Sequence, residues 1–145
     1  MQNVISLYRI VNLISDDPIS SEYHKKFKEY GFDIKKDLKT NKILDKEYFE
    51  ILVDLSEPIL YTKFKGKLDR SNSGEIFFRK LYVNFRNRVD LLRVIALVYI
   101  MDDNRATVFP FHIYLKSKKE DLSDSETKKI KAMMKNIEMN NGELK

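Results

Sequence analysis

Hydrophobic and polar residues alternate along three consecutive segments in the second half of the chain. These segments are 76–85, 92–100 and 107–115, and each is rich in aromatic and β-branched residues. This composition and spacing are typical of β-strands. Because only short polar stretches separate the segments, we expect an antiparallel meander, since a parallel pair needs a long crossover. The polar stretch 64–75 before them is predicted to be a loop or a ragged edge strand.

Apolar residues at helical spacing surround this meander. The C-terminal helix, expected over 123–139, has the clearest pattern, because Ser123 and Glu126 match a capping box. Its apolar stripe consists of Ile130, Met133, Met134 and Ile137.

Two more helices are predicted in the first half of the chain. One is expected to run to Tyr30 from a cap at Ser20 or Ser21, since a serine hydroxyl can accept a free N–H of the first turn. The other is expected to start at Asp45 and to stop before Pro58, because proline cannot continue a helix.

These elements predict a single α+β domain over 1–145. We expect a mainly helical part at 1–60, a basic β-meander at 61–122 and the C-terminal helix at 123–139. Within the first part, 4–14 fits one face of a helix, although its β-branched residues also fit a strand. The expected fold is a small antiparallel sheet of three or four strands, with helices packed on one face and an N-terminal helical extension.

Strand alternation divides the meander into two faces. Phe109, Phe111, Ile113 and Leu115 fall on one face, which is predicted to be the core beneath the helices. The opposite face is expected to be open and collects cationic and aromatic residues: Lys80, Tyr82, Arg93, His112, Tyr114 and Lys116.

Composition excludes several classes of protein. The 145 residues include no cysteine, which excludes disulfides, thiolate metal sites and a cysteine nucleophile. No apolar run approaches the roughly 20 residues that span a bilayer. The N-terminus has no basic leader and carries Arg9 within its apolar stretch, so no signal peptide is expected. These features favour a cytoplasmic protein without membrane association.

Positive charge is concentrated in the meander. The whole chain has a formal net charge of +5, but residues 63–119 alone have a net charge of +8. Residues 1–62 have a net charge of −2, and residues 120–145 a net charge of −1. A basic segment beside a near-neutral remainder is typical of a phosphate-binding surface. A lysine-rich surface without a ligand is the alternative.

The cationic and aromatic face suits RNA, because cations hold phosphates while rings stack on bases. Cleavage of RNA also needs a base for the 2′-hydroxyl, charge stabilisation at the phosphate and an acid for the leaving oxygen. Lysine, histidine and tyrosine can carry protons when their pKa is shifted, and arginine suits charge stabilisation. The only histidines, His24 and His112, lack metal-ligand spacing, and no glycine-rich phosphate loop is present. We therefore expect neither metal nor cofactor.

Each of these residues also has a purely structural interpretation. His112 can be a hydrogen-bonded sheet residue, and the tyrosines can be packing residues. Arg93 can form a salt bridge to Asp90 or Asp102 that only steadies the hairpin. The lysines after the last strand can protect a sheet edge from pairing. Alternation and charge by themselves leave these alternatives open.

A resemblance to a known family is carried by the run LYVNFRNRVDLLRVIALVYIMDDNRATVFPFHIYLKSKKED, residues 81–121. It combines a strand, a short loop, an arginine that enters a second apolar strand, an acidic turn, and a third strand that ends in lysines. With the helix that follows, the pattern covers roughly 76–138. This part of the chain resembles the C-terminal half of the RelE/ParE-like toxins of bacterial type II toxin–antitoxin systems.

The resemblance implies a RelE-like fold and a toxic activity. Many members of the family are ribosome-associated endoribonucleases that cut mRNA, others poison DNA gyrase, and a separate antitoxin protein usually wraps the toxin. Arg93 matches the arginine that opens the second strand and contacts phosphate, and Lys80 loosely matches a basic position in the preceding strand. The basic run after the last strand is matched by Lys116, Lys118 and Lys119.

The sequence thus predicts an endoribonuclease toxin with catalytic residues Arg93, His112, Lys116 and Lys80. RNA contacts are assigned to Tyr82, Tyr114, Lys118 and Lys119. Tyr82 stands where many relatives have an arginine, which leaves the reaction open. The alternatives are a gyrase-inhibiting toxin, or a non-enzymatic nucleic-acid or protein-binding module from a phage or mobile element.

Overall fold

The structure is a computed structural model. It describes the backbone of residues 4–5, 7–55, 59–60, 64–72, 74–85, 90–102 and 105–145, and the side chains of 9–55, 68–72, 74–83, 91–102 and 105–145. In chain order, the elements are β1 (Val4–Ile5), β2 (Leu7–Ile10), α1 (Pro18–Glu29), α2 (Ile34–Thr40), α3 (Asp45–Leu55), β3 (Ile59–Leu60), β4 (Phe64–Arg70), β5 (Ile76–Phe85), β6 (Asp90–Asp102), β7 (Arg105–Leu115) and α4 (Asp124–Met139).

Five strands form the main sheet, in the order β2–β7–β6–β5–β4. The antiparallel pairing of β5, β6 and β7 confirms the predicted meander. β4 pairs with β5, and register shifts at Lys65, Lys67 and Asp69 make it a ragged edge strand, one of the two predicted alternatives. The fold is α+β as expected, but the sheet has five strands instead of three or four because β2 joins its other edge.

The N-terminal segment is extended, so the helix expected at 4–14 is wrong. β1 pairs with β3 in a separate two-stranded sheet, and β2 pairs in parallel with β7, with Arg9 opposite Thr107. The Val11 N–H then donates to the Val108 carbonyl at 2.9 Å. Pairing overrides the helical spacing because the edge of β7 offers partners for these backbone groups, and β-branched residues fit a strand.

Helices α1 and α4 each begin at a residue whose side chain caps the helix. Asp17, instead of Ser20 or Ser21, caps α1, and its Oδ1 accepts the Ser20 N–H at 2.9 Å. A carboxylate is favourable there because the helix N-terminus carries partial positive charge. The capping box of Ser123 and Glu126 at the start of α4 is confirmed.

The other two helices differ in how well the sequence predicts them. α3 begins at Asp45 as predicted, whereas its expected stop at Pro58 lies outside the described residues. α2 is not predicted, because it has only seven residues and only two of them, Ile34 and Leu38, are buried. Two apolar residues in seven are too few to show the recurring spacing by which a helix is predicted.

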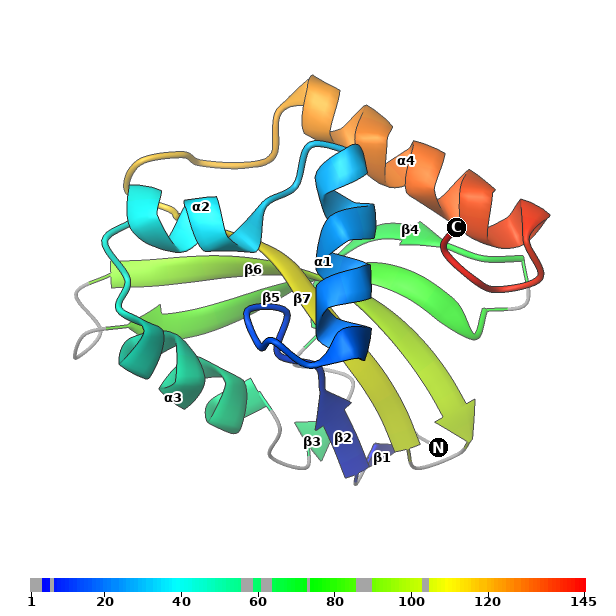
Figure 1. The fold of residues 1–145 in the computed structure, drawn as a ribbon, viewed down its shortest axis with the longest axis horizontal. Coiled ribbons are helices and arrows are strands. Elements are labelled where there is room, and N and C mark those ends of the chain that lie inside the picture. Colours follow the sequence, from blue (N-terminus) through cyan, green and yellow to red (C-terminus); the bar gives the residue numbers. More distant parts are fainter. Residues whose placement is uncertain are drawn as a thin grey trace.

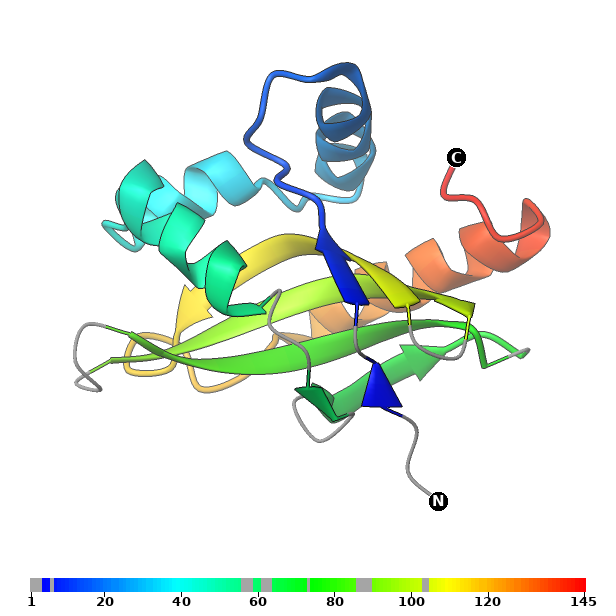
Figure 2. The same cartoon turned by 90° about the horizontal axis from the view of Figure 1, so that it is seen from below.

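Helices α1, α2 and α4 lie around a strongly twisted sheet. In Figure 1, α1 crosses in front of the strands, with α4 along one side and α3 on the other. Figure 2, turned by 90°, shows α1 and α2 above the sheet and the β1–β3 pair below it. Ring stacking ties α1 to β7: Tyr23 lies 4.3 Å from Phe109 and Phe27 lies 4.5 Å from Phe111, centroid to centroid.

A β-bulge in β7 changes which residues share a face of the sheet. Pro110 and His112 pair with consecutive residues of β6, so Phe111 is an extra residue in β7. Alternation changes phase at such a bulge, because two residues oppose one on the partner strand. Phe111 therefore lies on the same side as His112, and the Phe32 ring contacts both, at centroid distances of 5.0 and 5.2 Å.

The prediction of an open cationic face is therefore wrong. Lys80 and Arg93 are each only 9 % exposed, and His112 is 8 % exposed. The bulge brings Phe109 and Phe111, which were expected to face the other way, onto the side of His112. Burial of this face is tolerated because α2, α4 and the segment between β7 and α4 supply carboxylates to its cations.

Candidate functional site

Three of the predicted site residues lie side by side across the strands. Arg93 of β6 pairs with Tyr82 of β5 on one side and with Tyr114 of β7 on the other. Directly paired residues lie on the same face of a sheet with their Cβ atoms roughly 5 Å apart. Lys80 and His112, which both pair with Ile95, lie on this face two positions further along. Five of the eight predicted residues therefore share this face at one end of the sheet.

Arg93 is nearly buried and stacks on an aromatic ring. Its guanidinium carbon lies 4.2 Å from the centroid of the Tyr82 ring, and Tyr82 itself is 38 % exposed. One guanidinium nitrogen lies 3.4 Å from the Leu92 carbonyl. Among the described side chains, no carboxylate forms an ion pair with Arg93. Asp121, which pairs with Lys80, interacts with Arg93 electrostatically but forms no ion pair with it. A phosphate could therefore supply Arg93 with a directly bonded anion.

Of the two pairings that the sequence allows for Arg93, the one with Asp102 is not formed. Asp102 is paired with Arg105 instead, with 2.6 Å between Arg105 Nε and Asp102 Oδ2. The pairing with Asp90 lies outside the described side chains.

Lys80 is held by a carboxylate that the sequence does not single out. Its Nζ lies 2.6 Å from Oδ1 of Asp121, in the segment between β7 and α4. The hydrogen bond from Lys80 holds the pKa of the Asp121 carboxyl below its usual value, helped by the Leu122 N–H. Because Lys80 is nearly buried, this contact supplies the counter-ion that its position requires.

His112 lies between two carboxylates from different helices. Its Nδ1 is 2.8 Å from Oδ2 of Asp37 in α2, and its Nε2 is 2.9 Å from Oε2 of Glu126 in α4, an ion pair without good hydrogen-bond alignment. Burial lowers the pKa of the imidazole, but the contacts with Asp37 and Glu126 outweigh burial and raise it above 6.5. His112 therefore favours the imidazolium form, which joins β7 to both helices.

Glu126 also binds Lys119, so the charges form a chain. Burial would raise the pKa of Glu126, but the ion pair with His112 and hydrogen bonds from Lys119 and the Ser123 N–H hold it well below its usual value. The Lys119 ammonium lies 5.1 Å from the centroid of the Tyr114 ring. Lys119 therefore connects the ion pairs of His112 to the aromatic end of the site.

Lys116 and Lys118 do not join this cluster. Both side chains are exposed on the turn that follows β7. The backbone positions them: the Lys116 N–H donates to the Leu91 carbonyl at 2.9 Å, and the Lys118 N–H to the Leu115 carbonyl at 3.1 Å. Because both are exposed, they could contact an anionic polymer that extends past the site.

Sequence reasoning missed the three acidic residues of the site. Asp37 lies in the short helix that the sequence does not reveal, and Asp121 lies in an irregular segment. Glu126 is predicted as a helix cap, and it fulfils that role while also binding His112. The only available signal was the excess of acidic residues directly after the basic meander, at 120–126.

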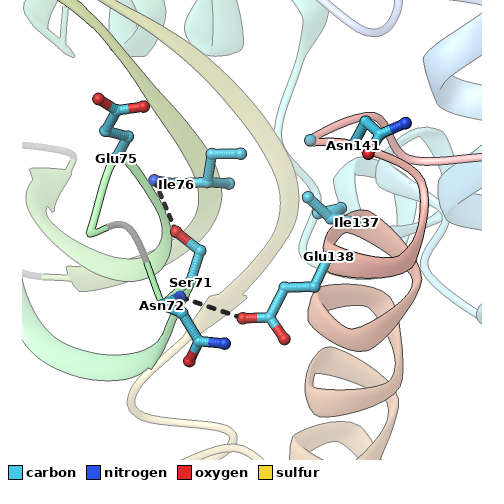
Figure 3. Close-up of a pocket in the computed structure, with 8 residues that line it drawn as sticks. Ser71, Asn72, Glu75, Ile76, Ile137, Glu138 and Asn141 are labelled. Atoms are coloured by element: carbon cyan, nitrogen blue, oxygen red, sulfur yellow. Dashed lines mark hydrogen bonds between the residues drawn. The ribbon is translucent and has the colours of Figure 1, made fainter.

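A separate hollow lies between the β4–β5 turn and the C-terminal end of α4 (Figure 3). It has a volume of about 350 Å³, and its polar lining includes Ser71, Asn72, Glu75, Glu138 and Asn141. The Asn72 N–H donates to Glu138 across it at 3.2 Å. Two carboxylates beside a helix C-terminus, which carries partial negative charge, do not suit a phosphate.

No group of three or more His, Cys, Asp or Glu side chains among the described residues is placed to hold a metal ion. In the same residues, none of the helices has the length and apolar character needed to cross a membrane. Comparisons of the chain with protein-family models, curated proteins and solved structures found no match.

Proposed function

We propose that this chain is the cytoplasmic toxin of a bacterial type II toxin–antitoxin system. It acts as an endoribonuclease that cleaves ribosome-bound mRNA. The observation that carries the proposal is Arg93, a nearly buried guanidinium stacked on a half-exposed tyrosine and paired with no described carboxylate. The basic segment 63–119 supports it, because its charge attracts the RNA backbone. A separate antitoxin chain is the expected neutralising partner.

In the proposed reaction, the 2′-hydroxyl of a ribose gives its proton to water and its oxygen attacks the adjacent phosphorus. The bond to the 5′-oxygen of the next nucleotide breaks, and that oxygen takes a proton from water. Negative charge grows on the non-bridging phosphate oxygens. Arg93 can hold two of these oxygens with its planar fork, and Lys80 can contribute a second positive charge. Tyr82 is exposed enough to stack on a base. Lys116, Lys118 and Lys119 would hold the flanking phosphates.

The role of His112 changes in this proposal. The sequence predicts it as a proton carrier, but both of its ring nitrogens face carboxylates. In this arrangement, His112 fixes α2 and α4 against the end of the sheet and thereby positions the residues around Arg93. Proton transfer to or from RNA would require it to leave Asp37 or Glu126.

Induced expression in a bacterial host tests the proposal through growth arrest and transcript cleavage. Arg93→Ala should abolish both, and Arg93→Lys should retain binding while losing about 10²–10³ in cleavage rate, because lysine keeps the charge but not the fork. Arg105→Ala is the matched control, since Arg105 is an exposed cation at the other end of the β6–β7 hairpin. It should behave as wild type.

Other outcomes would contradict the proposal. If folded Arg93→Ala arrests growth as strongly as wild type, Arg93 is structural. If the wild type arrests growth with intact transcripts but with inhibited DNA supercoiling, the gyrase-inhibiting alternative replaces the ribonuclease. If it neither arrests growth nor cleaves RNA, the non-enzymatic binding module is favoured.

A further inference from the structure

Asp121 places a carboxylate of the chain itself at the candidate site. Its side chain is 68 % exposed, whereas the side chain of its partner Lys80 is only 11 % exposed. The carboxylate thus reaches a nearly buried ammonium from the solvent side. Its other hydrogen bond, 2.8 Å from the N–H of Leu122, stays within its own segment. No packing of Asp121 therefore opposes its departure from Lys80.

A second group at the same position has an unused donor. The Tyr114 hydroxyl is buried, and no hydrogen-bond partner for it exists among the described residues. Burial raises the pKa of this hydroxyl, and the negative charge of Asp121 raises it further, so the group stays protonated and lies within electrostatic reach of that carboxylate. Buried hydroxyls usually have a hydrogen-bond partner, and this one is free to donate to an anion bound beside it.

Arg93 completes the set of donors. Together with Lys80, its charge lowers the pKa of the Asp121 carboxyl. Arg93 also pairs directly with Tyr114 across the β6–β7 ladder. Asp121 thus pairs with the Lys80 ammonium and interacts electrostatically with the Arg93 guanidinium and the Tyr114 hydroxyl.

We propose that Asp121 occupies a phosphate-binding site formed by Lys80, Arg93 and Tyr114, and that a phosphate group of the substrate displaces it. This inference rests on the proposed function for the identity of the ligand as an RNA phosphate. A phosphate has more charge and more acceptor oxygens than a carboxylate, so it can accept from all three groups at once. Asp121 keeps Lys80 compensated while the site is empty and leaves when the substrate supplies the charge.

Binding of inorganic pyrophosphate, measured by calorimetry at low salt, tests the site without any activity. Asp121→Asn should bind pyrophosphate about 2- to 5-fold more tightly, because it removes a carboxylate charge that competes with the anion for Lys80. Glu120→Gln is the matched control, since it removes one charge from the exposed neighbouring residue and should have little effect. Tyr114→Phe keeps the ring and should weaken binding about 2- to 10-fold through the lost hydroxyl.

A short single-stranded RNA, measured by fluorescence anisotropy, separates a free anion from a nucleic-acid phosphate. We expect the wild type and its variants to rank in the same order of affinity for RNA as for pyrophosphate. If the variants change the affinity for pyrophosphate but not for RNA, the ligand is not an RNA phosphate. Equal tightening by Asp121→Asn and Glu120→Gln would mean that only net charge matters, and the proposal fails. Weaker binding by Asp121→Asn would mean that Asp121 supports the site instead of occupying it.

These results are independent of the toxin assignment. If Asp121→Asn binds both probes more tightly but the wild type neither arrests growth nor cleaves transcripts, the phosphate site stands and the proposed function fails. If growth arrest depends on Arg93 but Asp121→Asn binds no better than the control, the proposed function stands and the displacement fails.

Discussion

One face of the sheet contains two halves that are buried in different ways. Under α1, the rings of Phe109 and Phe111 stack on Tyr23 and Phe27, and these ring contacts need no ion pair, although the Lys26 ammonium lies 4.9 Å from the Tyr23 centroid. At the other half, Lys80, Arg93 and His112 are just as inaccessible but carry charge. The first half is stabilised by removal of apolar area from water, which needs no specific partner. The second half is tolerated only where each cation finds an anion.

The charged half contains polar groups whose partners are incomplete. Lys80 and His112 have carboxylate partners, whereas Arg93 has none among the described residues and the Tyr114 hydroxyl has no hydrogen-bond partner there. The aromatic half contains no comparable deficit apart from the Tyr99 hydroxyl at its rim. A cation and a hydroxyl that both lack a direct partner at the same end of the sheet indicate a place for an anionic ligand.

The largest expected effect tests the aromatic half. Phe111→Ala should lower the free energy of unfolding by about 3–5 kcal/mol, because the ring is fully buried between Phe27, Phe32 and Phe78 and its removal leaves a cavity. Denaturant titration provides the measurement. The control is Phe49→Ala, whose ring is 60 % exposed and should change stability by less than about 1 kcal/mol. Equal effects would mean that the rings under α1 are not the core.

The next effect concerns the charged half and depends on pH. His112→Gln should cost about 1–3 kcal/mol near pH 6, because Asp37 loses a charged partner while Glu126 keeps Lys119. The folded state raises the pKa of His112, so the stability contributed by its charge is fully present below the unfolded pKa of about 6.5. It is lost as the pH rises through the folded pKa.

The difference in stability between wild type and His112→Gln should therefore shrink as the pH rises from 6 towards 9. Denaturant titration at several pH values measures it. His24, the other histidine, lies 3.1 Å from a single carboxylate, Asp33, and His24→Gln serves as the control. A difference that stays constant with pH would show that His112 is neutral in the folded protein.

The smallest effect concerns the exposed lysines outside the cluster. Reversal of charge at Lys116 and Lys118 should weaken RNA binding more than reversal at Lys35 and Lys36, which lie on α2 in the near-neutral half of the chain. Each lost phosphate contact should reduce the slope of log affinity against log salt by about 0.7. The same loss from both pairs would indicate a solvated basic surface, and would remove these two lysines from the RNA contact.

Local patterns predicted most of the fold. The meander, α3 and the capping box of α4 were predictable because each depends on spacing and caps within a short stretch of sequence. For the first strands, the local pattern left helix and strand open, because pairing with distant strands decides it: β1 pairs with β3, and β2 pairs with the edge of β7. Of the candidate site, Lys80, Tyr82, Arg93 and Tyr114 were identified by alternation and do lie together. Their partners Asp37 and Asp121 come from short irregular or helical segments that carry no pattern.

By itself, the sequence determined which residues could form strands and where positive charge gathers, since both follow from the order of residues along a short segment. The tertiary structure decided which face is buried. One extra residue, Phe111, shifts the phase of β7, and carboxylates from three distant segments then allow cations to be covered by helices. Such pairing depends on contacts between residues far apart in the chain, such as Asp37 with His112, and no local pattern contains it.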